Sequence, residues 1–233
     1  MDMTTGKAVY KTELHCHCKN VSLCASVTEE ELTNIYTEAG YTTVVLTNHF
    51  SPDHYDESWE RRVDRVVNAA GRFRNCAAGK IHVILGAEIR LFETRNDYLV
   101  YGDGIETMLR DNPNLLEMSL SDFSSCAHSY GLYVAQAHPF RVSMTIANPQ
   151  YLDGMEVFNA NSAADTPFST RWAERFGLHK QSGSDLHHPT ARPAGGILTE
   201  EPIITSNQLI KTLKSDGYSL IEGNLTVVSG TSD

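Results

Sequence analysis

The chain has 233 residues, which fits one large domain, and its hydrophobic content of 41% is enough for a full apolar core. Charged residues make up 21%, a globular value that excludes disorder as the dominant state. The formal net charge of −10 argues against a protein that binds nucleic acid through phosphate contacts, because no basic stripe is present. We therefore expect no nucleic-acid partner.

The sequence also predicts the cellular compartment of the protein. No stretch approaches the roughly 18 consecutive apolar residues of a membrane helix, and residues 1–9 lack the apolar segment of a signal peptide. An odd number of cysteines favours free thiols. We therefore expect a cytoplasmic protein with no membrane partner, whose oligomeric state the sequence does not reveal. The cysteines are Cys16, Cys18, Cys24, Cys76 and Cys126.

Strand-like and helical runs alternate along the chain. Residues 8–14 predict a strand, and Thr28 with Glu31 predicts a capping box that starts a helix ending at Gly40. The remaining predicted strands cover 42–47, 81–87, 98–101, 132–137, 152–158, 177–182 and 219–222, and the remaining predicted helices 57–78, 113–129, the segment carrying Trp172 and 207–215. Such units predict a parallel sheet with helices outside, and about seven of them indicate closure into a barrel. An open doubly wound sheet is the alternative.

Metal-ligand residue types come directly after several of these strands. His15 and His17 follow the first strand, and residues two apart in an extended chain project to the same side, so both imidazoles can reach one ion. A pair of exposed loop histidines is the alternative interpretation. Asp185 and His187 repeat this spacing near the end of the chain.

Glu88, His49 and His138 each follow an apolar run. A glutamate after a buried run is costly unless it is paired or bound to a metal, and its two oxygens can bridge two cations. The two histidines add nitrogen donors. This mixed nitrogen and oxygen set suits Zn²⁺, Mn²⁺ or Fe²⁺ better than Ca²⁺.

The ordered motifs point to a family. His15-Cys16-His17, Asn48-His49, Gly86-Ala87-Glu88, Ala137-His138-Pro139 and Ser184-Asp185-Leu186-His187 together resemble the PHP (polymerase and histidinol phosphatase) phosphoesterases over residues 13–188. The resemblance implies a single α/β domain over 1–233, a distorted (β/α)7 TIM-like barrel, with two or three metal ions at the strand ends.

The resemblance also implies a set of ligands. His15, His17, Glu88 and Asp185 would hold one ion, Glu88 would bridge to a second that His138 also binds, and His49 and His187 would serve a third.

The sequence departs from the family pattern at three places. Asn48 stands where members often have Asp, and Cys24 where trinuclear members usually have another histidine. Trinuclear members also have a histidine between the Glu and Ala-His-Pro motifs, and in the corresponding segment, 98–104, this chain has Asp103 as the candidate ligand instead. Two ions are therefore the safer expectation than three.

The resulting prediction is a metal-dependent phosphoesterase that hydrolyses a small phosphate ester such as a nucleoside monophosphate, a cyclic phosphate or histidinol phosphate. Glu88 and Asp185 would hold the ions that keep a bridging water as hydroxide for in-line attack. Arg141 is a candidate clamp for a phosphoryl oxygen, although it could equally be a surface ion-pair residue. Specificity would lie in the loops at 50–60 and 142–150.

Two other functions compete. An amidohydrolase-like barrel also uses His-x-His, but it usually has a metal-bridging lysine, and no lysine ends a suitable strand here. A metal-binding domain without turnover is the third hypothesis. Against it, the ligand set is largely intact.

Overall fold

The computed structural model describes residues 9–53, 57–162 and 166–223. The strands are β1 (Tyr10–Cys16), β2 (Tyr41–Leu46), β3 (His49–Phe50), β4 (His82–Arg90), β5 (Asp97–Tyr101), β6 (Tyr133–Gln136), β7 (Gly154–Asn159), β8 (His179–Gly183), β9 (Ile197–Thr199) and β10 (Ser219–Leu220). The helices are α1 (Glu29–Glu38), α2 (Trp59–Ala77), α3 (Ile105–Asp111), α4 (Leu120–Ser129), α5 (Thr166–Phe176) and α6 (Ser206–Ser215). The strand predicted over 8–14 is β1, although its first residue lies outside the described part.

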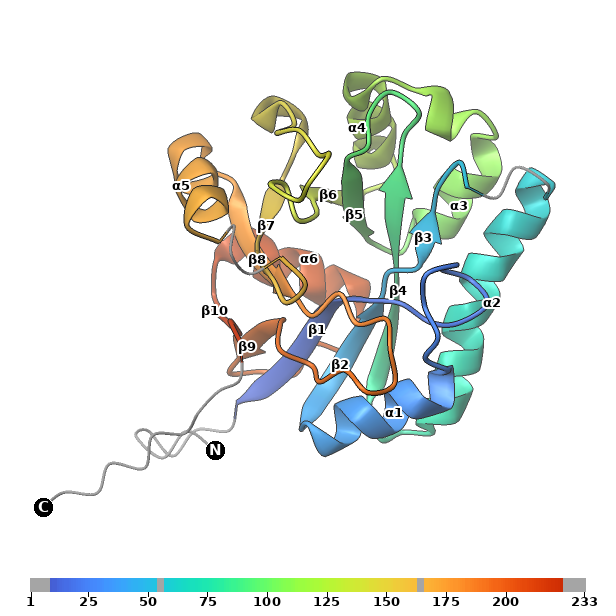
Figure 1. Cartoon of the computed structure of the whole chain (residues 1–233), viewed down its shortest axis with the longest axis vertical. Coiled ribbons are helices and arrows are strands. Elements are labelled where there is room, and N and C mark those ends of the chain that lie inside the picture. Colours follow the sequence, from blue (N-terminus) through green and yellow to red (C-terminus); the bar gives the residue numbers. More distant parts are fainter. Residues whose placement is uncertain (1–8, 54–56, 163–165, 224–233) are drawn as a thin grey trace, which may run out of the picture.

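The strands form one curved sheet in the order β10-β9-β1-β2-β4-β5-β6-β7-β8, and β3 pairs with β4 (Figure 1). Beyond β8 the chain returns to β1, where the Asp185 amide donates to the His15 carbonyl at 2.8 Å and the His17 amide to the Leu186 carbonyl at 3.0 Å. These bonds nearly close the sheet on itself. The predicted α/β barrel is confirmed.

The prediction that the sheet is parallel is wrong at β9 and β10, since β9 runs antiparallel to both β1 and β10. It is also wrong at β5, which runs antiparallel to both of its neighbours, β4 and β6. The cause is the short connection of residues 91–96, because a parallel crossover needs roughly a dozen residues or more. As a result, the beginning of β5 rather than its end lies beside the carboxyl ends of β4 and β6.

The helix predicted over 113–129 is also wrong in its extent. A separate helix, α3, ends at Asp111, and a 3₁₀ turn at Leu115–Glu117 precedes α4. Pro113 disfavours helical backbone at the residue before it, and the Ser119 side chain accepts a hydrogen bond from the Asp122 amide at the start of α4.

The capping box of α1 is confirmed. The Thr28 hydroxyl accepts from the Glu31 amide at 3.2 Å, and a Glu31 carboxylate oxygen accepts from the Thr28 amide at 2.8 Å. Gly40 follows the end of α1 with a φ of 75°, a backbone conformation that favours glycine.

Apolar residues form two layers. One layer packs the sheet against helices and includes Leu32 of α1, Phe73 of α2 and Phe123 of α4. The other contains Leu14 and Val45 of the sheet, joined by leucines of α6, which packs against β5 and β8. The second layer therefore fills the barrel interior. In the described part of the chain, no helix has the length and hydropathy needed to cross a bilayer.

Closure of the barrel leaves no room for a side chain at Gly183. A Cβ there would collide with Cβ of His15 and Oε1 of Glu156. We predict that Gly183→Ala destabilises the protein by about 1–3 kcal/mol through overpacking, measured by urea unfolding followed by circular dichroism. The control is Gly71→Ala in α2, where a Cβ meets nothing within 4 Å, and which should be neutral or stabilising by about 0.5–1 kcal/mol. A Gly183→Ala protein as stable as the parent would contradict this packing.

Candidate metal centre

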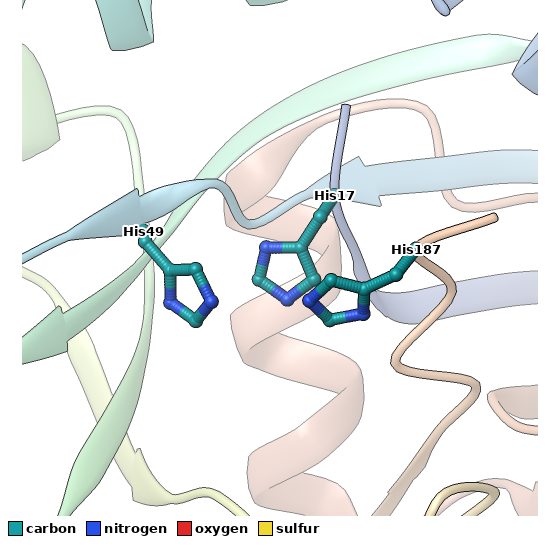
Figure 2. A group of neighbouring side chains, drawn as sticks. All are labelled: His17, His49 and His187. Carbon is teal, nitrogen blue, oxygen red and sulfur yellow. The ribbon is translucent and has the colours of Figure 1, made fainter. Parts of the chain in front are cut away.

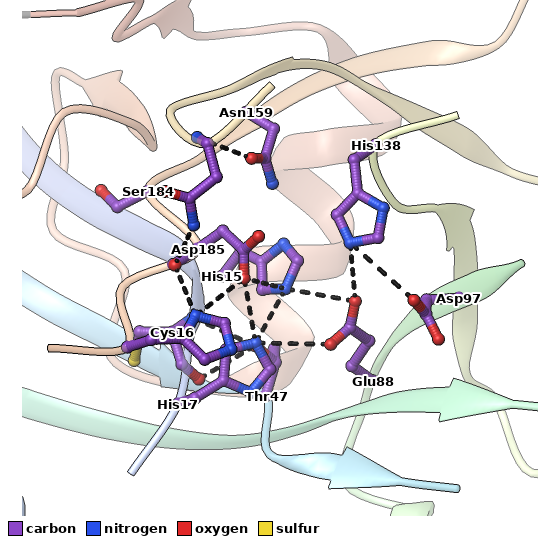
Figure 3. A network of polar contacts seen from close by, with 12 residues as sticks. His15, Cys16, His17, Thr47, Glu88, Asp97, His138, Asn159, Ser184 and Asp185 are labelled. Atoms are coloured by element: carbon purple, nitrogen blue, oxygen red, sulfur yellow. Dashed lines mark hydrogen bonds and ion pairs between the residues drawn. The ribbon is translucent and has the colours of Figure 1, made fainter. Parts of the chain in front are cut away.

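The structure brings the seven predicted ligands to one end of the barrel. They lie in strands or in the segments that follow them: His15, His17, His49, Glu88, His138, Asp185 and His187 (Figures 2 and 3). Five are almost fully buried, and only His49 and His187 keep partial exposure, at 19% and 14% of their side chains. The convergence expected for the ends of neighbouring strands is therefore present (Figure 3).

Glu88 lies at the middle of this group. Its Oε1 is 3.0 Å from His138 Nε2 and 3.4 Å from His15 Nε2. Its Oε2 is 2.7 Å from His49 Nδ1 and 3.3 Å from His17 Nε2. One carboxylate thus faces two imidazoles with each oxygen, as a bridging ligand would.

Ligand atoms within 4.8 Å of one another fall into three groups. The groups are His15, His17 and Asp185; His15, Glu88 and His138; and His17, His49 and His187. Figure 2 shows the third group, in which the rings of His17 and His187 lie 4.2 Å apart between centroids. Each group shares at least two residues with one ion position that the family resemblance implies, but Glu88 is missing from the first, His15 is added to the second and His17 is added to the third. The ligand sets and their occupation by metal stay predictions.

The hydrogen bonds around the imidazoles assign their tautomers. His15 Nδ1 lies 2.8 Å from Glu156 Oε1, a partner that only accepts, so Nδ1 carries a hydrogen. The Ser22 hydroxyl donates to Asn48 Oδ1 and therefore accepts from His17 Nδ1, at 3.0 Å. In their neutral forms both histidines then direct the Nε2 lone pair inward. These two Nε2 atoms lie only 3.1 Å apart.

The carboxylates also have unused acceptor capacity. Glu88 Oε2 and Asp185 Oδ2 are buried and accept no hydrogen bond. The short distance from Glu88 Oε2 to His49 Nδ1 lacks the geometry of a hydrogen bond. Buried carboxylate oxygens are normally paired, and facing lone pairs repel unless a cation lies between them. The donors therefore fit a bound divalent ion.

The electrostatics keep both carboxylates ionised. Burial alone would raise the pKa of Glu88, but His49 and His15 beside it hold that pKa well below its usual range. The pKa of Asp185 is likewise lowered by His15 and His17 against the effect of burial. Burial, with His49 beside it, lowers the pKa of His17 and keeps this ring neutral. Neighbouring carboxylates, against the effect of burial, raise the pKa values of His15 and His49. Metal ligands are ionised carboxylates and neutral imidazoles, so a bound cation would displace protons from these two rings.

Glu156, in β7, is a buried carboxylate that the sequence analysis missed. Besides orienting His15, it accepts from the His138 backbone amide at 2.9 Å and from Asn159 Nδ2 at 3.0 Å. It therefore fixes two candidate ligands at once. The available signal was an acidic residue inside the apolar strand predicted over 152–158, the same feature that singled out Glu88.

Glu13, in β1, is a second missed acid. Its Oε1 accepts from the His15 amide at 3.0 Å and from the Ser184 amide at 2.9 Å, so it joins the first strand to the last motif. Burial raises the pKa of this carboxyl to about 7, although these hydrogen bonds oppose the shift.

Asp103, named as a replacement ligand, is not in the centre. It is exposed after the far end of β5. Because β5 is reversed, Asp97 at its start occupies the corresponding place instead, with its Oδ2 4.0 Å from His138 Nε2. Arg90 binds both oxygens of Asp97, at 2.8 and 2.9 Å. Asp97 was missed because the sequence did not reveal the direction of β5.

Two residues of the centre have unusual backbone conformations. His138 has a φ of 27° and Asp185 a φ of 50°. Left-handed backbone at non-glycine residues costs about 1–3 kcal/mol and is concentrated at functional sites. The surrounding hydrogen bonds hold both residues in these backbone conformations, which set the directions of their side chains.

A cavity of about 590 Å³ opens onto this cluster. Arg141 lies in its wall, half-exposed, with Nη1 3.6 Å from Asp185 Oδ2. Arg90 and Arg95 also line it, and Arg95 forms no ion pair with the residues that the structure describes. The volume suits a small-molecule ligand. Asp53 and Asp97 also line the cavity and pair with Arg90, so Arg95 and Arg141 are the guanidinium groups that could bind an anion.

Cys24 also lines the cavity. Although burial alone would raise it, hydrogen bonds with His187 and His49 lower the pKa of the Cys24 thiol to about 6. Cys16 and Cys18, which flank His17 in the sequence, are buried in the apolar core. All five cysteines are free thiols.

No protein-family model and no curated protein matches this sequence, but solved structures share its fold. A two-domain protein containing a predicted PHP-like metal-dependent phosphoesterase, from Bacteroides vulgatus ATCC 8482, aligns with a TM-score of 0.64 at 17% identity over 94% of this chain and 66% of that one. PsfC from Pseudomonas syringae PB-5123 aligns with a TM-score of 0.70 at 17% identity over 92% and 91%. An Endonuclease Q in complex with a 27-mer duplex substrate carrying an abasic lesion aligns with a TM-score of 0.64 at 13% identity over 90% and 57%.

These comparisons confirm the PHP-type fold expected from the sequence motifs. The chain spans less than two thirds of the two-domain protein and of Endonuclease Q. At such low identity the likeness shows the fold alone.

The expectation of no nucleic-acid partner is corrected by the same comparison, because an Endonuclease Q with this fold is solved on duplex DNA. That expectation used the charge of the whole chain, −10. The relevant quantity is the local potential at the cavity, where arginines gather and where bound cations would add positive charge.

Glu156 provides a test of how the centre is supported. We predict that Glu156→Gln lowers the affinity for the first Zn²⁺ by about 10–100-fold, because the substituted amide no longer fixes the tautomer and direction of His15. Isothermal titration of metal-free protein measures this affinity. The matched control, Glu174→Gln on the exposed face of α5, should leave it unchanged. Equal affinity in Glu156→Gln protein would show that Glu156 does not orient a ligand.

Proposed function

We propose that this chain is a metal-dependent phosphoesterase that hydrolyses a phosphate ester held in the cavity above the His and carboxylate cluster. The observation that carries the proposal is the set of inward-facing donors: two buried carboxylate oxygens without hydrogen bonds, and two imidazole nitrogens 3.1 Å apart. Divalent cations would bind to such a set of donors. An anion would bind to the arginines of the adjoining cavity wall.

Two or three divalent ions are proposed, with His15, His17, His49, Glu88, His138, Asp185 and His187 as the ligands. The nitrogen and oxygen donors suit Zn²⁺, Mn²⁺ or Fe²⁺. When bound, such ions supply a water of lowered pKa and neutralise charge on phosphoryl oxygens. A cluster that is open to a cavity on one side keeps room for water and substrate.

The residues of this chain bind and orient the substrate. Arg141 and Arg95 hold non-bridging phosphoryl oxygens through charged hydrogen bonds, which fixes the phosphorus over the cluster. Asp185, 3.6 Å from Arg141, keeps that guanidinium directed at the centre. Arg90 contributes less, because Asp97 already neutralises it.

The substrate class stays open between phosphate monoesters and phosphodiesters. Small candidates are nucleoside monophosphates, cyclic phosphates and histidinol phosphate. A phosphodiester of DNA joins them, since Endonuclease Q has the same fold and the cavity opens outward. The amidohydrolase alternative is disfavoured because no lysine is among the described residues that line the cavity.

Glu88→Gln tests the reaction. We predict that this isosteric change lowers ester hydrolysis by at least about 10³-fold, because a neutral amide cannot bridge cations or neutralise their charge. With added Mn²⁺ or Zn²⁺, hydrolysis is measured as p-nitrophenol released from p-nitrophenyl phosphate and bis-p-nitrophenyl phosphate, as phosphate released from nucleoside monophosphates, and as strand cleavage of a duplex containing an abasic site. Metal content is determined on the same samples.

Turnover that persists in Glu88→Gln protein would contradict the proposed centre. Metal bound at full stoichiometry without turnover on the whole panel would instead favour a non-catalytic metal-binding domain.

The arginines provide a separate prediction. Arg141→Ala and Arg95→Ala should each raise KM by about 10–100-fold, the effect of losing one charged hydrogen bond to an anion, while metal content stays unchanged. Steady-state kinetics on the best substrate of the panel measures this. The control is Arg171→Ala, an exposed residue of α5 outside the cavity. Unchanged KM in both variants would remove the arginines from substrate binding.

A further inference from the structure

Apolar residues surround the mouth of the cavity. Leu23, in the loop after β1, and Val142, in the loop after β6, both line it. They are 70% and 91% exposed, more than any other large apolar residue that the structure describes. Phe168, at the start of α5, is 59% exposed and packs against Phe140, beside Arg141, with 5.8 Å between the ring centroids. Single apolar residues on a surface are common, but several around one opening are typical of a ligand-binding groove.

The two loops approach the cavity from opposite sides of the barrel. In the curved sheet, β1 and β6 are separated by β2, β4 and β5 in one direction and by β7 and β8 in the other. Leu23 and Val142 nevertheless line the same cavity. A ligand that enters between the two loops would therefore contact both side chains.

Hydrogen bonds hold both loops in place. In the first loop, the Ser26 amide donates to the His187 carbonyl at 2.9 Å. In the second, Gln136 Nε2 donates to the Thr145 carbonyl at 2.7 Å, and the Ala147 amide donates to Gln136 Oε1 at 3.0 Å. Ordered loops thus present the two exposed side chains, so a ligand that covers them immobilises little additional chain.

The inner and outer ends of the cavity differ in chemistry. The side chains of His49 and His187, which belong to the candidate metal centre, are only 19% and 14% exposed and mark the inner end. The far more exposed Leu23 and Val142 mark the outer end. A volume of about 590 Å³ is in the range that holds a whole small molecule, not a phosphate group alone. A phosphate bound at the inner end would direct the alcohol part of its ester toward the apolar mouth.

We propose that Leu23 and Val142 determine substrate specificity by packing against the alcohol part of the phosphate ester, which carries an apolar ring or chain. The inference rests on the proposed function, since it concerns the substrate of the same centre. Burial of an apolar group against the two side chains is favourable. The hydroxyl groups of glycerol or of a sugar would lose water against these side chains without gaining a hydrogen bond from them. Small esters that bear a ring are therefore preferred to sugar phosphates.

Non-hydrolysable phosphonates test this contact separately from turnover. Ethylphosphonate and 2-phenylethylphosphonate present the same anion without and with an apolar ring. Isothermal titration of the Mn²⁺-loaded parent protein should show that the phenyl compound binds at least about tenfold more tightly, because its ring is removed from water. The comparison within the parent protein needs no variant.

Substitutions then locate the contact. Leu23→Ser and Val142→Ser should each lower the ratio of the two affinities about three- to tenfold, because part of the apolar wall is lost. The control is Ile204→Ser, at an apolar residue that is 45% exposed and lies outside the cavity, and it should leave the ratio unchanged. Hydrolysis should follow the same order, with kcat/KM for 2-phenylethyl phosphate at least about tenfold above that for glycerol phosphate.

Each contrary outcome has a separate meaning. Equal affinities of the parent protein for the two phosphonates, or a ratio that neither serine variant changes, would overturn this inference and leave Glu88-dependent hydrolysis standing. Binding of neither phosphonate, together with no hydrolysis of any ester, would contradict the proposed function as well. Cleavage of the abasic duplex that is faster than hydrolysis of every small ester and is slowed in both serine variants would assign the two residues to nucleic acid and overturn the small-substrate class.

Discussion

The charge balance around two buried carboxylates is the constraint on which the structure depends. Glu88 and Asp185 are each 1% exposed, and removing such groups from water costs several kcal/mol unless positive charge compensates. The barrel supplies that charge through His15, which Glu156 holds, and through His49, because neighbouring carboxylates raise the pKa of both rings against the effect of burial. A shared cation would satisfy all of these groups at once. Binding of such a cation would then stabilise the barrel.

The strand arrangement decides which residues take part. Parallel strands bring His17 and Glu88 to one edge, and the reversed β5 brings Asp97 there from its opposite end. Closure of the sheet between β8 and β1 then adds Asp185, whose amide donates to the His15 carbonyl. Gly183 permits this closure because its neighbours, His15 and Glu156, fill the space that a side chain would need. The packing of the barrel and the geometry of the centre therefore depend on the same residues.

Sequence patterns predicted the barrel and the convergence of the seven donors. Period-two spacing and apolar runs are local features of the sequence, and residues that follow neighbouring strands lie at the same edge of the sheet. They did not predict Asp97 or Arg95, whose positions depend on the reversal of β5. Glu156 was detectable as a buried acid within an apolar strand, yet its role depends on pairing with His15, 141 residues away. Contacts of that kind require the three-dimensional structure.

The same distinction between local and global properties explains the charge argument. A net charge of −10 is a sum over the whole chain, but at physiological ionic strength charges act over about 8 Å. In the cavity wall, Asp97 and Asp53 pair with Arg90, and Asp185 lies 3.6 Å from Arg141, while Arg95 forms no ion pair with the described residues. Cations in the cluster would make this region still more positive. An acidic protein can therefore present a cavity suited to an anion, and its overall charge does not decide between a small anion and a nucleic acid.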